Sequence, residues 1–189
     1  MNTSSKTKKL VYAALFTALC CVATLSIQIP IPGTVGFIHP GDAFVILAGV
    51  FLGPVVGGLA AGIGSALANL LGGHFIWMPA TFIIKGLIAF LSGWAYYKIN
   101  KTNTFSRFVG VGIGGIFDII LVVTGYFIYG SFIMGPATAA IGIPWDAIQG
   151  LSGMILALAI YPLLRAVPDL RYQPSNTGGF SKRERNQTS

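Results

Sequence analysis

Long runs of apolar residues with almost no charge dominate this sequence and limit what it can fold into. Leu10 to Ile29 is an uncharged run of about 20 residues, and as a helix rising about 1.5 Å per residue it would cross roughly 30 Å of hydrocarbon. Charged residues make up only 9% of the chain, against about 25% in soluble domains. The sequence therefore predicts an all-α integral membrane protein.

Prolines and glycines divide the apolar sequence into six predicted transmembrane helices. Pro30 interrupts the first run and Gly53-Pro54 the second, because proline lacks a backbone donor and glycine permits turns. The second helix is short for a full crossing, so we expect it to be tilted, to be shielded by its neighbours or to begin before Asp42. The predicted spans, within a membrane domain of residues 10–165, are 10–29, 42–52, 55–71, 78–97, 109–129 and 145–164.

The segments outside this domain are polar and basic. Residues 1–9 form a lysine-bearing head, and residues 166–189 form a tail that we expect to be disordered. A cleaved signal peptide has a shorter apolar core and a small-residue cleavage site, so we expect the first helix to be retained. With both termini inside, the inner segments hold every Lys and Arg except Lys85, and the outer loops hold none. This asymmetry predicts cytoplasmic N- and C-termini, and it accounts for the net charge of +7 without nucleic acid binding.

Small residues recur at a spacing of four along several predicted helices. Gly49, Gly53 and Gly57 follow this pattern, as do Ala14 and Ala18 in the first helix. Such spacing lets helix backbones approach closely in lipid, where packing and not water exclusion drives association. We expect close packing within the bundle at most of these positions, and a docking face for another membrane subunit on the first helix.

Four ionisable residues lie inside or at the edges of the predicted spans: Asp42, Lys85, Asp118 and Asp146. A charged side chain at the bilayer centre costs about 3 kcal/mol on insertion scales, so each should face the bundle interior or water. Lys85 can pair with Asp118 or Asp146 in a purely structural ion pair, or these groups can bind a ligand. The sequence leaves both interpretations open.

Polar and aromatic side chains gather toward the outer ends of the predicted helices. Each alone, above all a tryptophan, is often an interfacial anchor. Together they predict one outer cavity with aromatic walls and a few hydrogen-bonding groups, suited to a small, flat, polar heterocycle. With the ionisable residues, the predicted substrate-binding set is His39, Asp42, Asn69, Trp77, Lys85, Asp118, Tyr126, Trp145, Asp146 and Gln149.

Motifs for catalysis or energy conversion are missing from the sequence. It has no G-x-x-x-x-G-K-[ST] loop for ATP hydrolysis by the common route, and no H-E-x-x-H, G-x-S-x-G or Cys–His cluster. Its two cysteines, Cys20 and Cys21, are neighbours that we expect to pack as small apolar residues. We therefore expect no enzyme activity, no cofactor and no metal, and a partner that supplies the energy for whatever process the binding pocket serves.

Several stretches of the chain resemble one family of membrane proteins. They are Ala14-Leu-Phe-Thr-Ala18, Gly36-Phe-Ile-His-Pro-Gly-Asp-Ala-Phe-Val45, Leu52-Gly-Pro-Val-Val-Gly-Gly58, Ile63-Gly-Ser-Ala-Leu-Ala-Asn69 and Pro79-Ala-Thr-Phe-Ile-Ile-Lys-Gly86. From about residue 8 to residue 165 the chain is similar to the substrate-binding (S) components of energy-coupling factor (ECF) transporters. It most resembles the riboflavin-type group, which includes members assigned to pyridoxine or hydroxymethylpyrimidine.

This resemblance implies a six-helix subunit in a prokaryotic plasma membrane that binds a vitamin or vitamin precursor at its outer face. It also implies a transmembrane coupling subunit, contacted through Ala14 and Ala18, and two cytoplasmic ATPase subunits. We expect a pyridoxine- or hydroxymethylpyrimidine-like ligand, with riboflavin second. The pocket positions that match the family are Trp77, Thr81, Lys85, Tyr126, Asp146 and Gln149.

Two other functions fit parts of the sequence. Asp118 and Lys85 are suited to the relay of a self-sufficient, ion-coupled carrier, which would need no ATPase. In a structural membrane subunit, the same charges would only hold helices together. Uptake by the purified chain alone distinguishes the first function, and the absence of any stabilising vitamin distinguishes the second.

Overall fold

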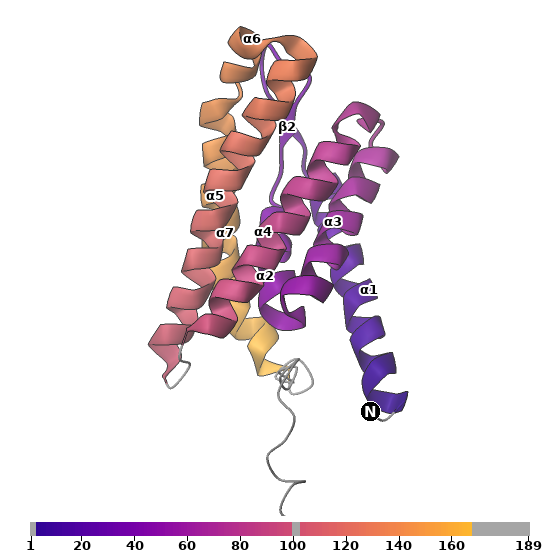
Figure 1. The fold of residues 1–189 in the computed structure, drawn as a ribbon, viewed down its shortest axis with the longest axis vertical. Coiled ribbons are helices and arrows are strands. Elements are labelled where there is room, and N and C mark those ends of the chain that lie inside the picture. Colours follow the sequence, from indigo (N-terminus) through magenta and orange to yellow (C-terminus); the bar gives the residue numbers. More distant parts are fainter. Residues whose placement is uncertain (1–2, 100–102, 168–189) are drawn as a thin grey trace, which may run out of the picture.

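The computed structural model describes residues 3–99 and 103–167, which are almost entirely helical (Figure 1). Two two-residue strands, β1 and β2, pair antiparallel between the first two helices, with Ile29 opposite Ile38. A short 3-10 helix, η1, precedes α4. The elements are α1 (Thr3–Ser26), β1 (Ile29–Pro30), β2 (Phe37–Ile38), α2 (Asp42–Leu52), α3 (Pro54–Leu71), η1 (Phe75–Trp77), α4 (Met78–Lys98), α5 (Thr104–Met134), α6 (Pro136–Ala140) and α7 (Ile143–Ala166).

Within the described residues, five helical segments are long and apolar enough to cross a membrane, and α2 is a shorter apolar helix. The five segments carry large apolar side chains that face outward, among them Leu71, Phe132 and Leu163, which are 70%, 86% and 70% exposed. The predicted tail lies outside the described residues apart from Ala166 and Val167. The five segments are 7–26, 54–71, 75–98, 104–134 and 136–166.

The C-terminal half contains more helix than the sequence predicts. The expected loop over residues 130–144 is mostly helical, because α5 continues to Met134 and α6 follows at once. Gly135, at a φ of 84°, ends α5, and Pro136 begins α6 at a position where its missing N–H costs nothing. At its other end, α5 begins earlier than predicted because the side chain of Asn103 accepts a hydrogen bond from the Ser106 N–H at 2.9 Å.

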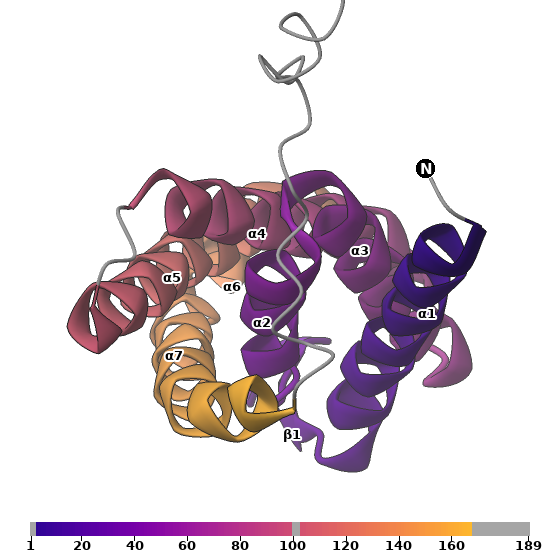
Figure 2. The ribbon, with the colours of Figure 1, turned by 90° about the horizontal axis from the view of Figure 1, so that it is seen from below.

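The short helix α2 lies in the middle of the bundle. Helices α1, α3, α4, α5 and α7 all pack against it, as the view along the bundle shows (Figure 2). Eight of its 11 residues are buried, so its neighbours shield it, which is one of the three possibilities expected from its length. A helix of this length is only about 16 Å long. It therefore fills only part of the depth of the bundle.

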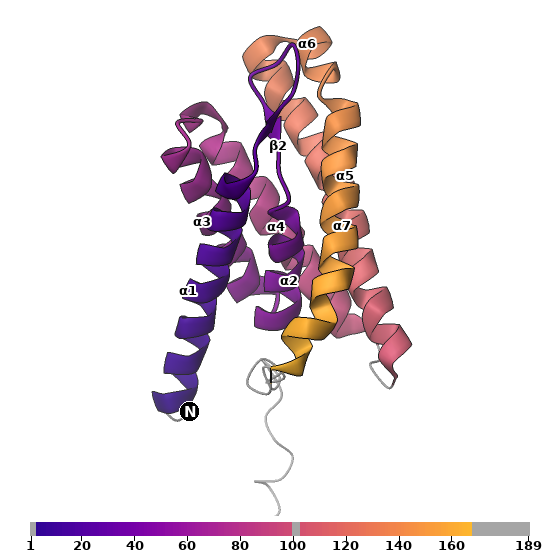
Figure 3. The same cartoon turned by 180° about the vertical axis from the view of Figure 1, so that it is seen from behind.

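The remaining depth above α2 is occupied by the β1–β2 hairpin. Figures 1 and 3 show the hairpin and α6 at one end of the bundle, and the start of α1 and the end of α7 together at the other. Helix α5 has 31 residues and is about 46 Å long. It extends beside the hairpin at this end of the bundle.

Glycines allow the central helices to touch through their backbones, as the spacing of four predicts. A Cβ added at Gly49 of α2 would collide with the carbonyl oxygen of Ala89 in α4, and one added at Gly57 of α3 would collide with Ala48 of α2. Gly62 of α3 likewise lies against the carbonyl oxygen of Phe82 in α4, at 2.9 Å from the added Cβ. The close packing of α2, α3 and α4 therefore requires glycine, which has no Cβ, at these positions.

Replacing Gly49 with alanine tests this packing. We expect Gly49→Ala to destabilise the protein by about 1–3 kcal/mol, because the new methyl group meets backbone that cannot move alone. The matched control is Gly112→Ala in α5, where an added Cβ meets nothing within 4 Å and alanine favours the helix. The apparent melting temperature in detergent should fall for the first variant and stay level or rise for the second. Equal melting temperatures would contradict the proposed backbone contact.

Candidate functional site

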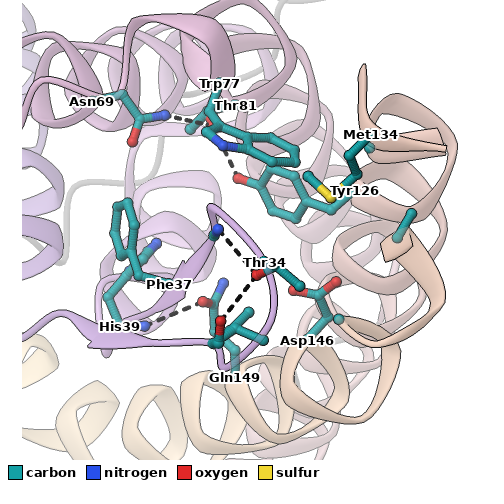
Figure 4. A pocket seen from close by; sticks show the side chains of 15 residues that line it. Thr34, Phe37, His39, Asn69, Trp77, Thr81, Tyr126, Met134, Asp146 and Gln149 are labelled. Atoms are coloured by element: carbon teal, nitrogen blue, oxygen red, sulfur yellow. Dashed lines mark hydrogen bonds between the residues drawn. The ribbon is translucent and has the colours of Figure 1, made fainter. Parts of the chain in front are cut away.

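A cavity lies at the hairpin end of the bundle, above α2. Its volume is about 610 Å³ when the open space at its mouth is included. The hairpin segment, α3, α4, α5, α6 and α7 all contribute to its wall (Figure 4). Its lining residues are Ile31, Thr34, Gly36, Phe37, His39, Asn69, Trp77, Thr81, Tyr126, Gly130, Met134, Ala139, Gly142, Asp146 and Gln149.

An aromatic cluster forms one wall of the cavity. Trp77 meets Tyr126 edge to face at a centroid distance of 5.9 Å, and it lies 5.7 Å from the ring of Tyr129. The Tyr129 hydroxyl donates to the carbonyl oxygen of Ile76 at 2.6 Å, which ties α5 to the turn that carries Trp77. The buried indole N–H of Trp77 has no hydrogen-bond partner among the described residues. The wall therefore offers ring surface together with one unused donor.

A chain of polar side chains continues along this wall. The amide of Asn69 donates to the Thr81 hydroxyl at 2.7 Å, and the Thr81 and Tyr126 hydroxyls lie 3.1 Å apart. The three residues come from α3, α4 and α5, and each lines the cavity. Because a hydroxyl both donates and accepts, this chain can adjust to a donor or an acceptor on a bound molecule.

Helix α7 supplies an acid and an amide to the cavity. Asp146 lies in the first turn of α7, where the partial positive charge of the helix end favours a carboxylate. It is 8% exposed, so it is accessible from the cavity but largely removed from solvent. Gln149, one turn further along, accepts from the backbone N–H of His39 at 3.2 Å. This bond ties α7 to the segment that follows the hairpin.

The side chain of His39 is fixed in its neutral form. Its Nδ1 accepts a hydrogen bond from the Gly41 N–H at 3.1 Å, which leaves the ring proton on Nε2. Burial lowers the pKa of His39 to about 4, even though the nearby Asp42 acts in the opposite direction. His39 therefore brings a neutral imidazole to the cavity at neutral pH.

A buried ion pair lies behind the cavity. The Lys85 ammonium donates to Asp42 Oδ1 at 2.5 Å, and Gln149 donates to Asp42 Oδ2 at 2.8 Å. The same ammonium lies 5.5 Å from the centroid of the Tyr126 ring. A structural ion pair of Lys85, one of the two interpretations left open by the sequence, is therefore present, but its partner is Asp42 and not Asp118 or Asp146. Asp42 is the partner because α2 is the central helix, which brings its first residue against α4.

The structure brings most of the predicted site residues together, in two groups. Asp42 and Lys85 form the ion pair behind the cavity. Asp118 is buried in α5 away from the lining, and Trp145 is half-buried and does not line the cavity either. The predicted residues that do line the cavity are His39, Asn69, Trp77, Thr81, Tyr126, Asp146 and Gln149.

Several lining residues were not anticipated from the sequence. Thr34 and Phe37 belong to the hairpin, and Met134 and Ala139 to the α5–α6 region. In the sequence, both regions have the pattern of loops between spans. The prolines and glycines around them indicate that the helices are interrupted there, but they do not indicate where the segments fold back.

The outer face of α1 is exposed and built from small and aliphatic side chains. Ala14 and Ala18 are both exposed, and the aliphatic neighbours Leu10, Leu15 and Val22 are 72%, 47% and 63% exposed. On its other face, α1 packs against α2 and α3. The predicted docking residues are thus on the surface of the chain.

Taken together, the apolar exterior, the helices long enough to span a membrane and the cavity at one end of the bundle define a multi-pass membrane protein with a cavity lined by polar and aromatic side chains. Residues 4–166 match the family described as "ECF-type riboflavin transporter, S component". The chain therefore belongs to the ECF transporter S-component family, which is a family of substrate-binding transport components and not of enzymes.

Two relatives are similar to this chain over most of its length. A Lactococcus lactis subsp. cremoris protein named thiamine precursor transporter HmpT is 30% identical over 83% of this chain and 87% of its own length. A Pyrococcus woesei protein described as uncharacterized is 36% identical over 71% of this chain and 86% of its own length.

Two solved structures resemble the fold. The S component of a bacterial ECF transporter has a TM-score of 0.62 and 25% identity, covering 85% of this chain and 97% of that one. The S component for biotin has a TM-score of 0.55 and 22% identity, covering 86% and 95%, and it supports the fold alone. The protein is thus a multi-pass membrane S component.

Proposed function

We propose that this chain captures hydroxymethylpyrimidine or a similarly substituted small ring, such as pyridoxine, for ATP-driven uptake. The cavity carries the proposal: it combines an aromatic wall at Trp77 and Tyr126 with the carboxylate of Asp146. A flat ring stacks or packs edge-on against aromatic side chains, and a ring amine or hydroxyl donates to a carboxylate. The relative named as a thiamine precursor transporter supports the pyrimidine in particular. Riboflavin is the second candidate, because the matching family is described by that vitamin.

In this proposal some residues contact the ligand directly, and others hold the contacting residues in position. His39, Asn69, Thr81 and Gln149 would offer hydrogen bonds to the ring substituents, beside the three groups named above. Asp42 and Lys85 would act behind them, because their ion pair holds Gln149 through the 2.8 Å hydrogen bond to Asp42. Trp145 would serve as an anchor at the start of α7, and Asp118 would have a separate role.

The proposed arrangement in the membrane has six crossings, with α2 as the short one and both termini in the cytoplasm. The charge distribution supports it, since the start of α1, the end of α4, the start of α5 and the end of α7, which carry Lys and Arg among the described residues, lie at the end of the bundle opposite the cavity. The cavity would then open to the outside of a prokaryotic plasma membrane. Capture from outside suits a subunit of an uptake system.

The energy for transport would come from a transmembrane coupling subunit and two cytoplasmic ATPases. The exposed small-residue face of α1, with Ala14 and Ala18, would be the docking surface for the coupling subunit. Small residues at a helix surface allow a second helix to approach closely in lipid. This proposal follows the family, in which S components work with such partners.

Identification of the co-purified molecule tests the proposed ligand. The protein is purified in mild detergent from cells grown in rich medium, and small molecules are extracted and identified by mass spectrometry. We expect hydroxymethylpyrimidine or pyridoxine in near-stoichiometric amount. A preparation of Asp146→Asn carried through the same steps serves as the control and should hold much less. Recovery of riboflavin would favour the second candidate, and an empty wild-type protein that no vitamin stabilises would contradict a binding function.

A bulky side chain on the exposed face of α1 should abolish transport and leave ligand binding intact. We expect Ala18→Trp to bind the ligand with wild-type affinity but to lose most uptake in cells that express the complete transporter, because the indole blocks helix approach. The control is Ile120→Trp on α5, where the wild-type side chain is 51% exposed and the new ring should face lipid. Loss of ligand binding in Ala18→Trp, or normal uptake, would contradict the docking role.

A further inference from the structure

Asp118 is a buried acid that neither the cavity nor the ion pair uses. It lies in α5, its side chain is 0% exposed, and neither carboxylate oxygen has a hydrogen-bond partner among the described residues. Asp42 is equally buried, but Lys85 and Gln149 donate to its two oxygens. Asp42 therefore has hydrogen-bond donors that stabilise an ionised carboxylate, whereas Asp118 has none among the described residues.

The surroundings of Asp118 are defined on each side that packs against it. Helix α2 brings Asp42 and helix α4 brings Lys85 close enough to interact electrostatically with Asp118. Helix α7 brings Gly153: a Cβ added there would lie 2.6 Å from Asp42 Cβ and 3.0 Å from Asp118 Oδ2. The two acids thus share the space beside one glycine.

The charges in this cluster do not balance if both acids are ionised. Two carboxylates would face one ammonium, with all three side chains at 0% exposure, and Lys85 already donates to Asp42. An unpaired ion in a dry interior costs far more than a neutral acid of the same shape, even one without a hydrogen bond. Binding one proton removes the surplus negative charge.

We therefore propose that Asp118 is a proton-binding site, which holds a neutral carboxylic acid in the resting protein at neutral pH. Loss of that proton gives Lys85 a second carboxylate that competes with Asp42. Asp42 accepts a hydrogen bond from the Gln149 side chain, and that side chain accepts one from the backbone N–H of His39 at the cavity. The bound proton thus keeps the wall of the cavity in place. The proposal does not depend on which ligand the cavity takes.

Infrared spectroscopy tests the protonation state directly. In purified wild-type protein at neutral pH we expect the C=O stretching band of a protonated carboxylic acid, at higher frequency than the carboxylate bands. The band should lose a component in Asp118→Asn and keep that component in Asp146→Asn, which controls for the other buried acid that is not ion-paired. If the wild-type protein has no such band, or Asp118→Asn leaves it unchanged, the proposal is overturned.

The pH dependence of stability gives a second test, with a sign fixed by linkage. If the folded protein keeps the proton that the unfolded chain releases near pH 4, wild-type stability falls as pH rises above that value, by up to about tenfold in the unfolding equilibrium constant per pH unit. Asp118→Asn, a neutral isostere, lacks this loss. The melting temperature of the variant should therefore exceed that of wild type by a margin that grows from pH 5 to pH 8.

A variant that is less stable than wild type at neutral pH, with a deficit that does not shrink as pH rises, would show that Asp118 is needed as an ion and would overturn the proposal. If Asp118→Asn does not fold, the infrared band decides through Asp146→Asn. A protonated-acid band in that protein supports a proton at Asp118, since Asp42 is paired with Lys85, and its absence contradicts it.

Discussion

Lys85→Met should destabilise the protein by about 3–5 kcal/mol, because it removes the ammonium that is paired with the fully buried carboxylate of Asp42. Methionine is close to lysine in length, so the change removes the charge with little loss of volume. We expect a large fall in the apparent melting temperature in detergent. Binding of the ligand should weaken as well, since Asp42 positions Gln149 at the cavity.

The double variant Asp42→Asn/Lys85→Met is the control for this prediction. Removing both charges leaves no unpaired ion, so the double variant should be more stable than Lys85→Met alone. Asp42→Asn alone should be the milder of the two single changes, because Asp118 can release its proton and supply a carboxylate to Lys85. If the double variant were as unstable as the sum of the two single variants, the side chains would contribute independently and not as a pair.

Asp146→Asn should weaken binding of hydroxymethylpyrimidine roughly 10- to 100-fold, because it replaces a charge-assisted hydrogen bond, worth about 1.5–3 kcal/mol, with a neutral contact. The proposed carboxylate lies at the cavity wall in the first turn of α7. Calorimetric titration of the ligand into the two purified proteins measures the difference.

Trp145→Phe is the matched control for Asp146→Asn. Trp145 is the preceding residue and is only half-buried, and it does not line the cavity. Its substitution should leave the affinity within about twofold of wild type. Substitutions outside the core and outside a binding site usually shift free energies by less than about 0.5 kcal/mol. Equal losses in the two variants would mean that the start of α7 acts through its shape and not through the carboxylate.

Three of the helices follow closely from the sequence, whereas α1 starts seven residues before the predicted span and α5 is five residues longer at each end. The residues of α2 coincide with the short predicted segment 42–52, and those of α3 and α4 differ from prediction by one residue at an end. Glycine and proline mark these ends chemically, so a single sequence contains the information. The hairpin and α6 follow less well, because their positions depend on packing against helices far along the chain.

The candidate site, like the fold, could be predicted from the sequence only in part. Trp145 and Asp146 were both predicted to bind, yet neighbours on a helix point about 100° apart and cannot both face one cavity. Asp118 lies eight residues before Tyr126, which is about 12 Å along α5. The sequence identified most of the buried polar residues but not Thr24, Ser65 or Ser92. The pairing of those it identified depended on the central position of α2, which no spacing along the chain reveals. The Lys85–Asp42 pair is the clearest example.

Calorimetric titration of hydroxymethylpyrimidine into the wild-type protein tests the central claim most directly. The account predicts saturable binding of one molecule per chain, in the absence of any partner subunit. The same titration with pyridoxine and riboflavin ranks the candidates. If none of the three compounds binds to protein that is folded and monodisperse, the cavity is not a site for these ligands and the proposed function is contradicted.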